Sequence, residues 1–271
     1  MTRIIQIRKP HPKGQLKRLW QNREAVQALV GRQFKSRFEK PMVGLSWMLL
    51  QPIILAGLFA IFFGALVRVP SGNLPYPAFV FVGIALWQGV QRALSESANV
   101  FESAAPMLRQ TSLPRLAPVL ANVIGASIDV MLALIVAVFA GLLFGTTIGL
   151  SLFLAPVFLL LALIATIGLA AALGGLCGAW RDLRQTIALG LQILMFASPV
   201  IYPSSLIPEQ YRVLYALNPY AGVIEGLRFT LLGGPMPDPL YLLISASSAF
   251  AVFIIGIWLF LSLEGRAADA L

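Results

Sequence analysis

Long stretches without a charged residue dominate the chain. Stretches free of Asp, Glu, Lys and Arg cover residues 41–67, 69–91, 130–180, 185–208 and 239–263. A helix needs about 20 mostly apolar residues to cross the hydrocarbon core of a membrane. The third stretch is therefore long enough for two crossings, and the glycine-containing segment 145–149 is the expected turn between them.

This pattern predicts an all-α membrane protein with six transmembrane helices. The expected spans are roughly 44–67, 77–95, 119–144, 150–177, 185–203 and 240–262. They divide the chain into a basic segment at 1–40, a transmembrane domain at 41–265 and a short tail at 266–271.

Basic residues are distributed unevenly over the two sides of this arrangement. Eleven of the 20 Lys and Arg residues precede residue 41, and with six spans both termini lie on that side. Six more fall on the same side: Arg92, Arg109, Arg115, Arg181, Arg184 and Arg266. The other side carries Arg68, Arg212 and Arg228. Because cytoplasmic loops carry the excess of Lys and Arg, both termini are expected in the cytoplasm.

The basic N-terminal segment has no early apolar region, so it is not expected to be a signal peptide. Its apolar positions between Leu19 and Phe38 recur near helical spacing, and most charges fall elsewhere. This pattern predicts an amphipathic helix at the membrane interface, where basic side chains meet anionic lipids. A helix packed on a soluble partner is the alternative.

Composition excludes several classes of protein. Hydrophobic residues make up 58% of the chain and charged residues 11%, whereas soluble domains carry about 25% charged residues. The net charge of +9 fits membrane orientation better than nucleic-acid binding, given where the charges lie. One Cys and one His exclude a disulfide framework and a Cys/His metal cluster, so we expect no metal site.

The motifs expected of an enzyme are missing. The sequence has no G-x-x-x-x-G-K-[ST] phosphate loop and no G-x-S-x-G or H-E-x-x-H motif. Arg181 and Asp182 are the best acid/base pair, but a cytoplasmic loop explains them more simply. We therefore expect neither enzymatic activity nor a bound cofactor.

Two interrupted segments carry the remaining polar features. The cytoplasmic loop at 96–118 is too long for a simple turn, and it is either a docking helix for a soluble partner or a solvated connector. The outer segment at 208–238 is too apolar for open water and too interrupted to span, which predicts two re-entrant half-helices. Asn218 and Pro219 should start the second half-helix, and Gly233 should end it. Within it, Glu225 and Arg228 are placed to pair.

One carboxylate lies deep within an expected span. Asp129 is about ten residues into the third span, and Asn122 lies seven positions earlier on the same face. An intramembrane carboxylate is a functional candidate, so a proton-coupled transporter using Asp129 is one alternative. The lack of a His or Lys relay partner favours a structural role.

Four sequence strings, in order and at matching spacing, resemble the membrane subunits of ABC-2 exporters for O-antigen, capsular polysaccharide and teichoic acid. They are GLSWMLLQP at 44–52, FVGIALWQ at 81–88, SPVIYP at 198–203 and LNPYAGVIEGLR at 217–228. The resemblance covers nearly the whole chain from about residue 29. It implies a permease in the bacterial inner membrane that exports polysaccharide linked to undecaprenyl diphosphate.

The resemblance also implies partners and residue roles. The permease would be a homodimer with two copies of a separate ATPase that uses ATP and Mg²⁺, and the polymer would pass between the protomers. The half-helices at 208–232 would form an outer gate. The loop at 96–118 would dock on the ATPase, and the coupling candidates in it are Glu102, Met107, Arg109 and Arg115. This loop, LRQTSLPR at 108–115, has fewer Lys residues than the family pattern.

Aromatic residues are the candidates for the substrate path, since tyrosine and tryptophan combine an apolar ring with a hydrogen-bonding group. These candidates are Tyr76, Trp87, Tyr202, Tyr211, Tyr215 and Tyr220, together with Glu225 and Arg228. The alternative for each aromatic is the interfacial belt of membrane proteins. A related ABC-2 exporter of drugs or small amphiphiles is a second alternative function.

Overall fold

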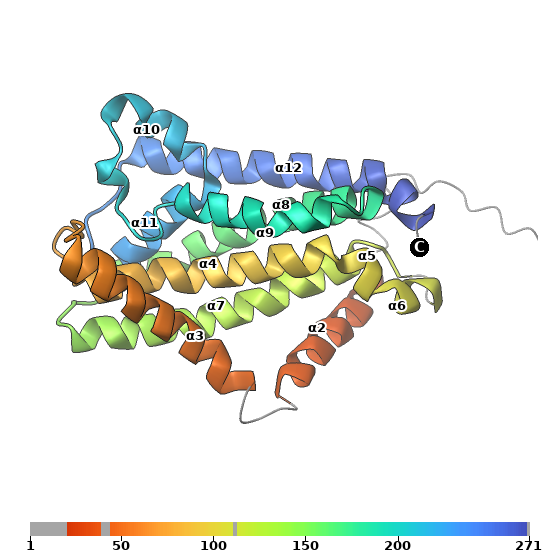
Figure 1. Ribbon diagram of the computed structural model, residues 1–271, viewed down its shortest axis with the longest axis horizontal. Coiled ribbons are helices and arrows are strands. Elements are labelled where there is room, and N and C mark those ends of the chain that lie inside the picture. Colours follow the sequence, from red (N-terminus) through yellow and green to blue (C-terminus); the bar gives the residue numbers. More distant parts are fainter. Residues whose placement is uncertain (1–20, 39–43, 111–112, 270–271) are drawn as a thin grey trace, which may run out of the picture.

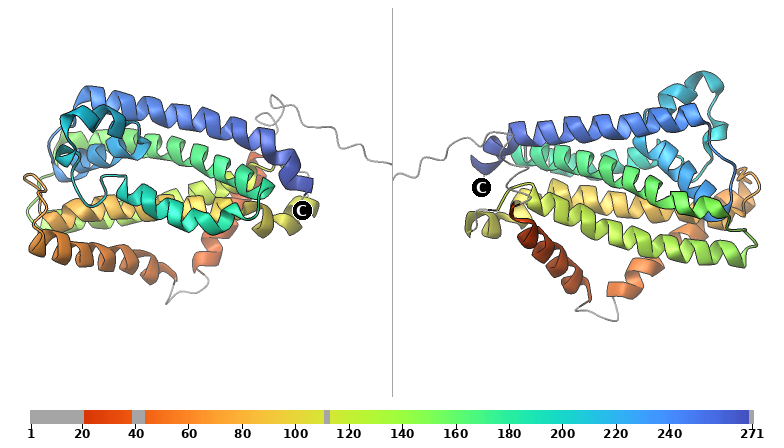
Figure 2. Two further views of the ribbon diagram at one scale, coloured as in Figure 1. Left: turned by 45° about the horizontal axis from the view of Figure 1, so that its top comes forward. Right: turned by 180° about the vertical axis from the view of Figure 1, so that it is seen from behind.

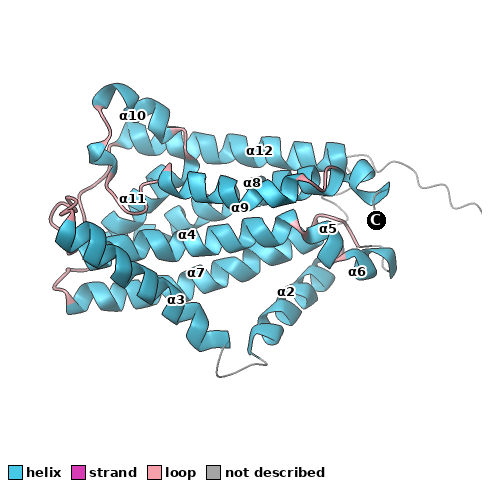
Figure 3. Ribbon diagram, viewed as in Figure 1, coloured by secondary structure: helices cyan, strands magenta, loops and turns pink. Residues whose placement is uncertain are grey.

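The structure is a computed structural model that describes residues 21–38, 44–110 and 113–269, and the regular elements in these ranges are all helical (Figure 3). Five helices within them are long and apolar enough to cross a membrane. They cover Leu49–Leu66, Tyr76–Ala98, Ala117–Leu143, Leu150–Ala179 and Pro239–Arg266. The prediction of an all-α, multi-pass membrane protein is therefore confirmed, and five of the six expected spans match a long helix.

Four long helices form the bundle, and α4 is its centre. Figures 1 and 2 show α4 (Tyr76–Ala98), α7 (Ala117–Leu143), α8 (Ala155–Ala179) and α12 (Pro239–Asp269) running side by side. An apolar 18-residue window of α4 is 78% buried, against 11% for the window at Leu49–Leu66. The α4 helix therefore provides the packing surface for α7 and α8, whereas α12 packs on α8.

Two N-terminal helices lie beside this bundle. The first long helix consists of α3 (Gly44–Phe59) and a π-helical continuation, η1 (Ala60–Leu66), and it crosses α4 obliquely in Figure 1. The α2 helix (Arg23–Phe38) packs on α7. Along α2, Val26 and Val30 are half-buried, but the exposed Arg23 projects onto their face. The charged and apolar residues of α2 therefore do not fall on two fully separate faces. A position of α2 at the membrane interface stays a prediction.

The expected span at 185–203 forms a shorter helix. The α9 helix (Leu183–Phe196) has 14 residues, about 21 Å at 1.5 Å per residue, which is less than the hydrocarbon core of about 30 Å. Turns follow at 197–200, where Val200 N donates to Ser198 O at 2.7 Å, and Pro199 and Pro203 interrupt the helical pattern. A sixth crossing therefore stays a prediction.

One end of the bundle, here called the α11 end, carries two short helices in the segment 208–238. They are α10 (Glu209–Ala216) and α11 (Pro219–Leu232), and a 3-10 turn, η3 (Ser204–Leu206), precedes them. The Asn218 side chain accepts a hydrogen bond from Tyr220 N, and Gly233 is left-handed at φ 69°. Both predicted ends of α11 are thus confirmed.

The expected turn between the two crossings of 130–180 also lies at the α11 end. Gly145 follows α7 with φ 86°, a conformation that glycine adopts without strain. A 3-10 turn, η2 (Leu150–Leu154), then leads into α8.

The opposite end, here called the α6 end, carries the remaining short helices. They are α5 (Val100–Ser103) and α6 (Ala105–Gln110), which follow α4 directly. Figure 1 places them near the last turns of α12. The loop predicted at 96–118 is therefore largely helical within its described residues.

Glycines allow α8 and α12 to pack more extensively than any other pair of helices in the described part of the chain. A Cβ atom built on Gly256 would lie 1.9 Å from Gly168 O, and one on Gly168 would lie 2.5 Å from Val252 O. Two backbones at this distance leave no room for a side chain, which is how small residues promote helix association in membranes.

We predict that Gly256→Ala destabilises the bundle by about 1–3 kcal/mol, because the added methyl group forces α8 and α12 apart. The midpoint of thermal unfolding in detergent measures this loss. Gly190→Ala is the matched control on α9, since a Cβ atom there meets nothing within 4 Å. Equal midpoints for the two variants would contradict the close packing.

Candidate functional sites at the two ends of the bundle

Arg228 is the buried centre of the α11 end. Its side chain is 2% exposed. The Nε atom donates to Phe79 O at 3.1 Å, and Nη2 donates to Val200 O at 2.8 Å. One guanidinium thereby connects α11, the first turn of α4 and the loop after α9.

The charge of this guanidinium is balanced within the same cluster. Arg228 Nη1 lies 3.5 Å from Glu225 Oε1, which confirms the predicted pair. Glu225 Oε1 also accepts a hydrogen bond from Ser204 N at 2.8 Å. The guanidinium carbon lies 3.4 Å from the centre of the Phe79 ring, a cation–π geometry. The sequence indicated the pair but gave no sign of Phe79 or Ser204.

The segment 197–203 after α9 is held by two further side chains. Tyr76 OH donates to Ile201 O at 2.8 Å. Asn218 Nδ2 donates to Ala197 O at 3.0 Å and to Ser198 Oγ at 2.8 Å. These hydrogen bonds give partners to backbone carbonyls that lie outside a regular helix.

Three of the six aromatic path candidates lie in the core of the bundle. Trp87, Tyr76 and Tyr220 are buried. The rings of Trp87 and Tyr220 meet edge to face with centroids 6.0 Å apart, and Tyr220 OH lies 3.1 Å from Thr166 Oγ1. In this conformation their evident role is packing between α4, α8 and α11.

The other three aromatic candidates lie around α10. Tyr215 OH donates to Tyr202 OH at 3.1 Å, and Tyr202 OH donates to Phe196 O at 2.7 Å. Burial and the hydrogen bond to Tyr202 both raise the pKa of Tyr215 above its usual value, so its hydroxyl stays neutral. Tyr211 is 53% exposed.

Two cavities adjoin this tyrosine group. Tyr211, Tyr215 and Tyr220 all line a largely apolar cavity of about 600 Å³. A second cavity of about 270 Å³ is more polar and is lined by side chains that include Arg212, Glu225, Asp238 and Tyr241. The structure thus brings together several of the residues expected at an outer gate, although Trp87 lies deeper.

Asp129 has a basic partner that the sequence interpretation missed. Arg92 Nη1 forms an ion pair with Asp129 Oδ2 between α4 and α7. The sequence interpretation places Arg92 on the cytoplasmic side of the second expected span and considers only His and Lys as relay partners. Asp129 and Asn122 are both buried, as predicted for an inward polar stripe.

At the α6 end, two of the four coupling candidates contact distant parts of the chain. Glu102 on α5 pairs with Arg184 at the start of α9, and Arg115 Nη1 donates to Glu264 O on α12 at 2.7 Å. Met107 is half-buried on α6. Arg109 also belongs to α6, but its side chain lies outside the described part of the structure.

A comparison with protein families matches residues 24–232 to the ABC-2 type transporter model, well over half of the chain. The chain belongs to the ABC-2 type transporter family. The match includes α2, the first four long helices, α9 and both short helices of the α11 end.

Relatives of this ABC-2 transporter chain carry names from polysaccharide export. The chain is 25% identical over 244 residues to the O-antigen export system permease protein RfbA of Klebsiella pneumoniae, covering 90% of this chain and 93% of that protein. The RfbA protein of Myxococcus xanthus is 24% identical, with 82% and 86% covered. The polysialic acid transport protein KpsM of Escherichia coli is 25% identical, with 88% and 93% covered.

We predict that Arg228→Met destabilises the transporter by roughly 3–5 kcal/mol, because Glu225 loses its cation and two buried carbonyls lose their donor. Thermal unfolding in detergent measures the loss, and faster amide hydrogen exchange at 197–203 would locate it. Arg212→Met is the control, since Arg212 is 46% exposed and pairs with the exposed Glu209. A cost as small as that of the control would contradict the central role of Arg228.

Proposed function

We propose that the chain is the membrane-spanning permease subunit of an exporter that moves undecaprenyl diphosphate-linked polysaccharide, such as O-antigen, across the bacterial inner membrane. The observation that carries the proposal is family membership, combined with relatives named for polysaccharide export along nine-tenths of the chain. The chain itself is the transporter component and is not an enzyme. A cytoplasmic position for both termini, with six crossings, follows from the distribution of Lys and Arg.

Energy would come from two copies of a separate ABC ATPase that uses ATP and Mg²⁺. Support comes from the α6 end, where Glu102 on α5 pairs with Arg184 on α9, and Arg115, in the segment before α7, donates to Glu264 O on α12. A displacement of α5 would be transmitted to α9 through the Glu102–Arg184 pair. This arrangement favours the docking role of the loop over a solvated connector.

The polymer path would lie between two copies of the chain. The core between α4, α8 and α11 is filled by Trp87 and Tyr220, so a wide polymer would have to pass along the surface of the bundle. The first long helix has the least buried window of the five candidate spans in the described residues, and its exposed Ile53, Ile61 and Phe62 are available for a partner copy. Tyr202, Tyr211 and Tyr215 would face the polymer as it leaves, at the half-helices of an outer gate.

Proton coupling through Asp129 is less well supported than ATP-driven export. Its carboxylate pairs with Arg92 between α4 and α7, which favours a structural role. A drug-exporting ABC-2 relative would share this fold, and the relatives named above favour polysaccharide over small amphiphiles.

We predict that the purified chain hydrolyses no ATP, and that proteoliposomes export lipid-linked O-antigen only when the chain is reconstituted with its nucleotide-binding subunit and supplied with MgATP. Polysaccharide reaching an enclosed glycosidase measures export. A proton gradient without ATP is the control. Export driven by that gradient alone would favour the proton-coupled alternative, and ATP hydrolysis by the lone chain would contradict the proposal.

We further predict that Glu102→Lys lowers export per ATP hydrolysed several-fold, since it places two cations together at the start of α9. Combining it with Arg184→Glu should restore coupling, because the exchanged pair can re-form. Arg109→Glu should also uncouple, through the ATPase contact. Glu209→Lys, at the exposed pair of the α11 end, is the control. Unchanged coupling in Glu102→Lys and in Arg109→Glu would make the loop a simple connector.

A further inference from the structure

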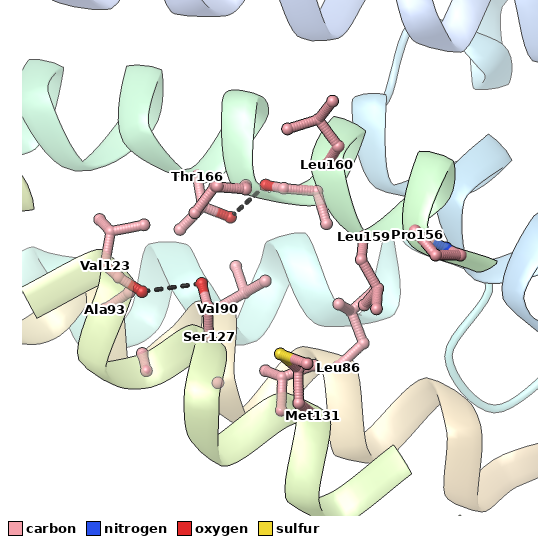
Figure 4. A pocket seen from close by; sticks show the side chains of 15 residues that line it. Leu86, Val90, Ala93, Val123, Ser127, Met131, Pro156, Leu159, Leu160 and Thr166 are labelled. Atoms are coloured by element: carbon pink, nitrogen blue, oxygen red, sulfur yellow. Dashed lines mark hydrogen bonds between the residues drawn. The ribbon is translucent and has the colours of Figure 1, made fainter. Parts of the chain in front are cut away.

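A groove runs between α7 and α8, with α4 as its floor. Both helices pack more extensively on α4 than on each other. The space left between them is a cavity of about 320 Å³, within the usual range for small-molecule sites (Figure 4). Small residues are among those that line it, including Gly89 and Ala93 on α4 and Ala126 on α7.

The groove offers nothing to a polar ligand. Among its lining residues, the hydroxyl side chains are Ser127 and Thr166. Ser127 Oγ donates to Val123 O at 2.8 Å, and Thr166 Oγ1 donates to Ala162 O at 2.7 Å, as the dashed lines in Figure 4 mark. The rest of the lining is aliphatic, with one methionine and one proline. A ligand without hydrogen-bonding groups matches this surface.

The open side of the groove lies at hydrocarbon depth. Met131 and Leu160 stand on its two rims, and they are 54% and 55% exposed. Met131 is 14 residues from the start of α7, about 21 Å at 1.5 Å per residue, so it lies near the middle of that span. At this depth the molecules next to the opening are lipid acyl chains.

We propose that the groove binds one acyl chain of a bilayer phospholipid as a specific lipid site. A vacant groove would leave its lining without dispersion contacts on one side, and an inserted chain restores them. A flexible hydrocarbon chain enters a cavity of this width, whereas a helix from a second copy would need the rims to separate. The inference is independent of the proposed export function.

The test is photolabelling of the full chain in phosphatidylethanolamine and phosphatidylglycerol nanodiscs that contain a trace of phosphatidylcholine with a mid-chain diazirine. We expect peptides containing Met131 and Leu160 to be labelled several-fold above those containing the exposed Ile254 and Ile255 of α12. Ser127→Leu should fill the groove and reduce that ratio to about one. Equal labelling of both surfaces in the unmodified chain would overturn the proposal.

Ser262→Leu is the matched control. Ser262 is exposed on α12, and its hydroxyl donates to Trp258 O at 2.8 Å in the same manner as Ser127 to Val123. This variant should leave the labelling ratio unchanged. If Ser127→Leu fails to give a monodisperse protein, Leu163→Trp fills the groove from α8. An unchanged ratio in the filled variant, or a change in its oligomeric state that marks the groove as an interface between copies, would overturn the proposal.

Discussion

A buried cation constrains the whole α11 end. Arg228 is 2% exposed, its Nε and Nη2 donate to the carbonyls of Phe79 and Val200, and its Nη1 lies 3.5 Å from the carboxylate of Glu225. A guanidinium with this burial is tolerated only when such partners surround it, because removal from water is costly for an ion. The carbonyls of the irregular backbone at 197–203 need donors because they lie outside a regular helix. The guanidinium supplies hydrogen-bond donors and the carbonyls supply acceptors, so this contact joins α4, the loop after α9 and α11 into one unit.

The described part of the chain combines this rigid unit with more loosely attached helices. Close packing of Gly168 against Gly256 joins α8 to α12, and α4 is buried among its neighbours. The first long helix, by contrast, is largely exposed and crosses the bundle obliquely. In a proposed exporter of polymers, a stable unit of this kind would carry the gate while an exposed helix contacts a second copy.

Sequence patterns predicted the features that depend on neighbouring residues. The long apolar helices, the cap at Asn218, the left-handed Gly233 and the pairing of Glu225 with Arg228 all follow from local spacing. The shortness of α9 was missed because its apolar stretch continues through Pro199 and Pro203, where the chain turns instead of spanning. Contacts such as Arg92–Asp129 and Glu102–Arg184 join residues 37 and 82 positions apart, and nothing in their local sequence indicates them.

The pair between Arg92 and Asp129 bears most directly on whether protons or ATP would drive transport. In the structure the carboxylate of Asp129 is held in an ion pair with Arg92 between α4 and α7. Neutralising Asp129 would leave Arg92 without this partner between two packed helices. The same pair instead suits a structural role, because it joins α4 to α7 within the bundle. Under the proposed export function, energy would enter at the α6 end, where Glu102 on α5 pairs with Arg184 on α9.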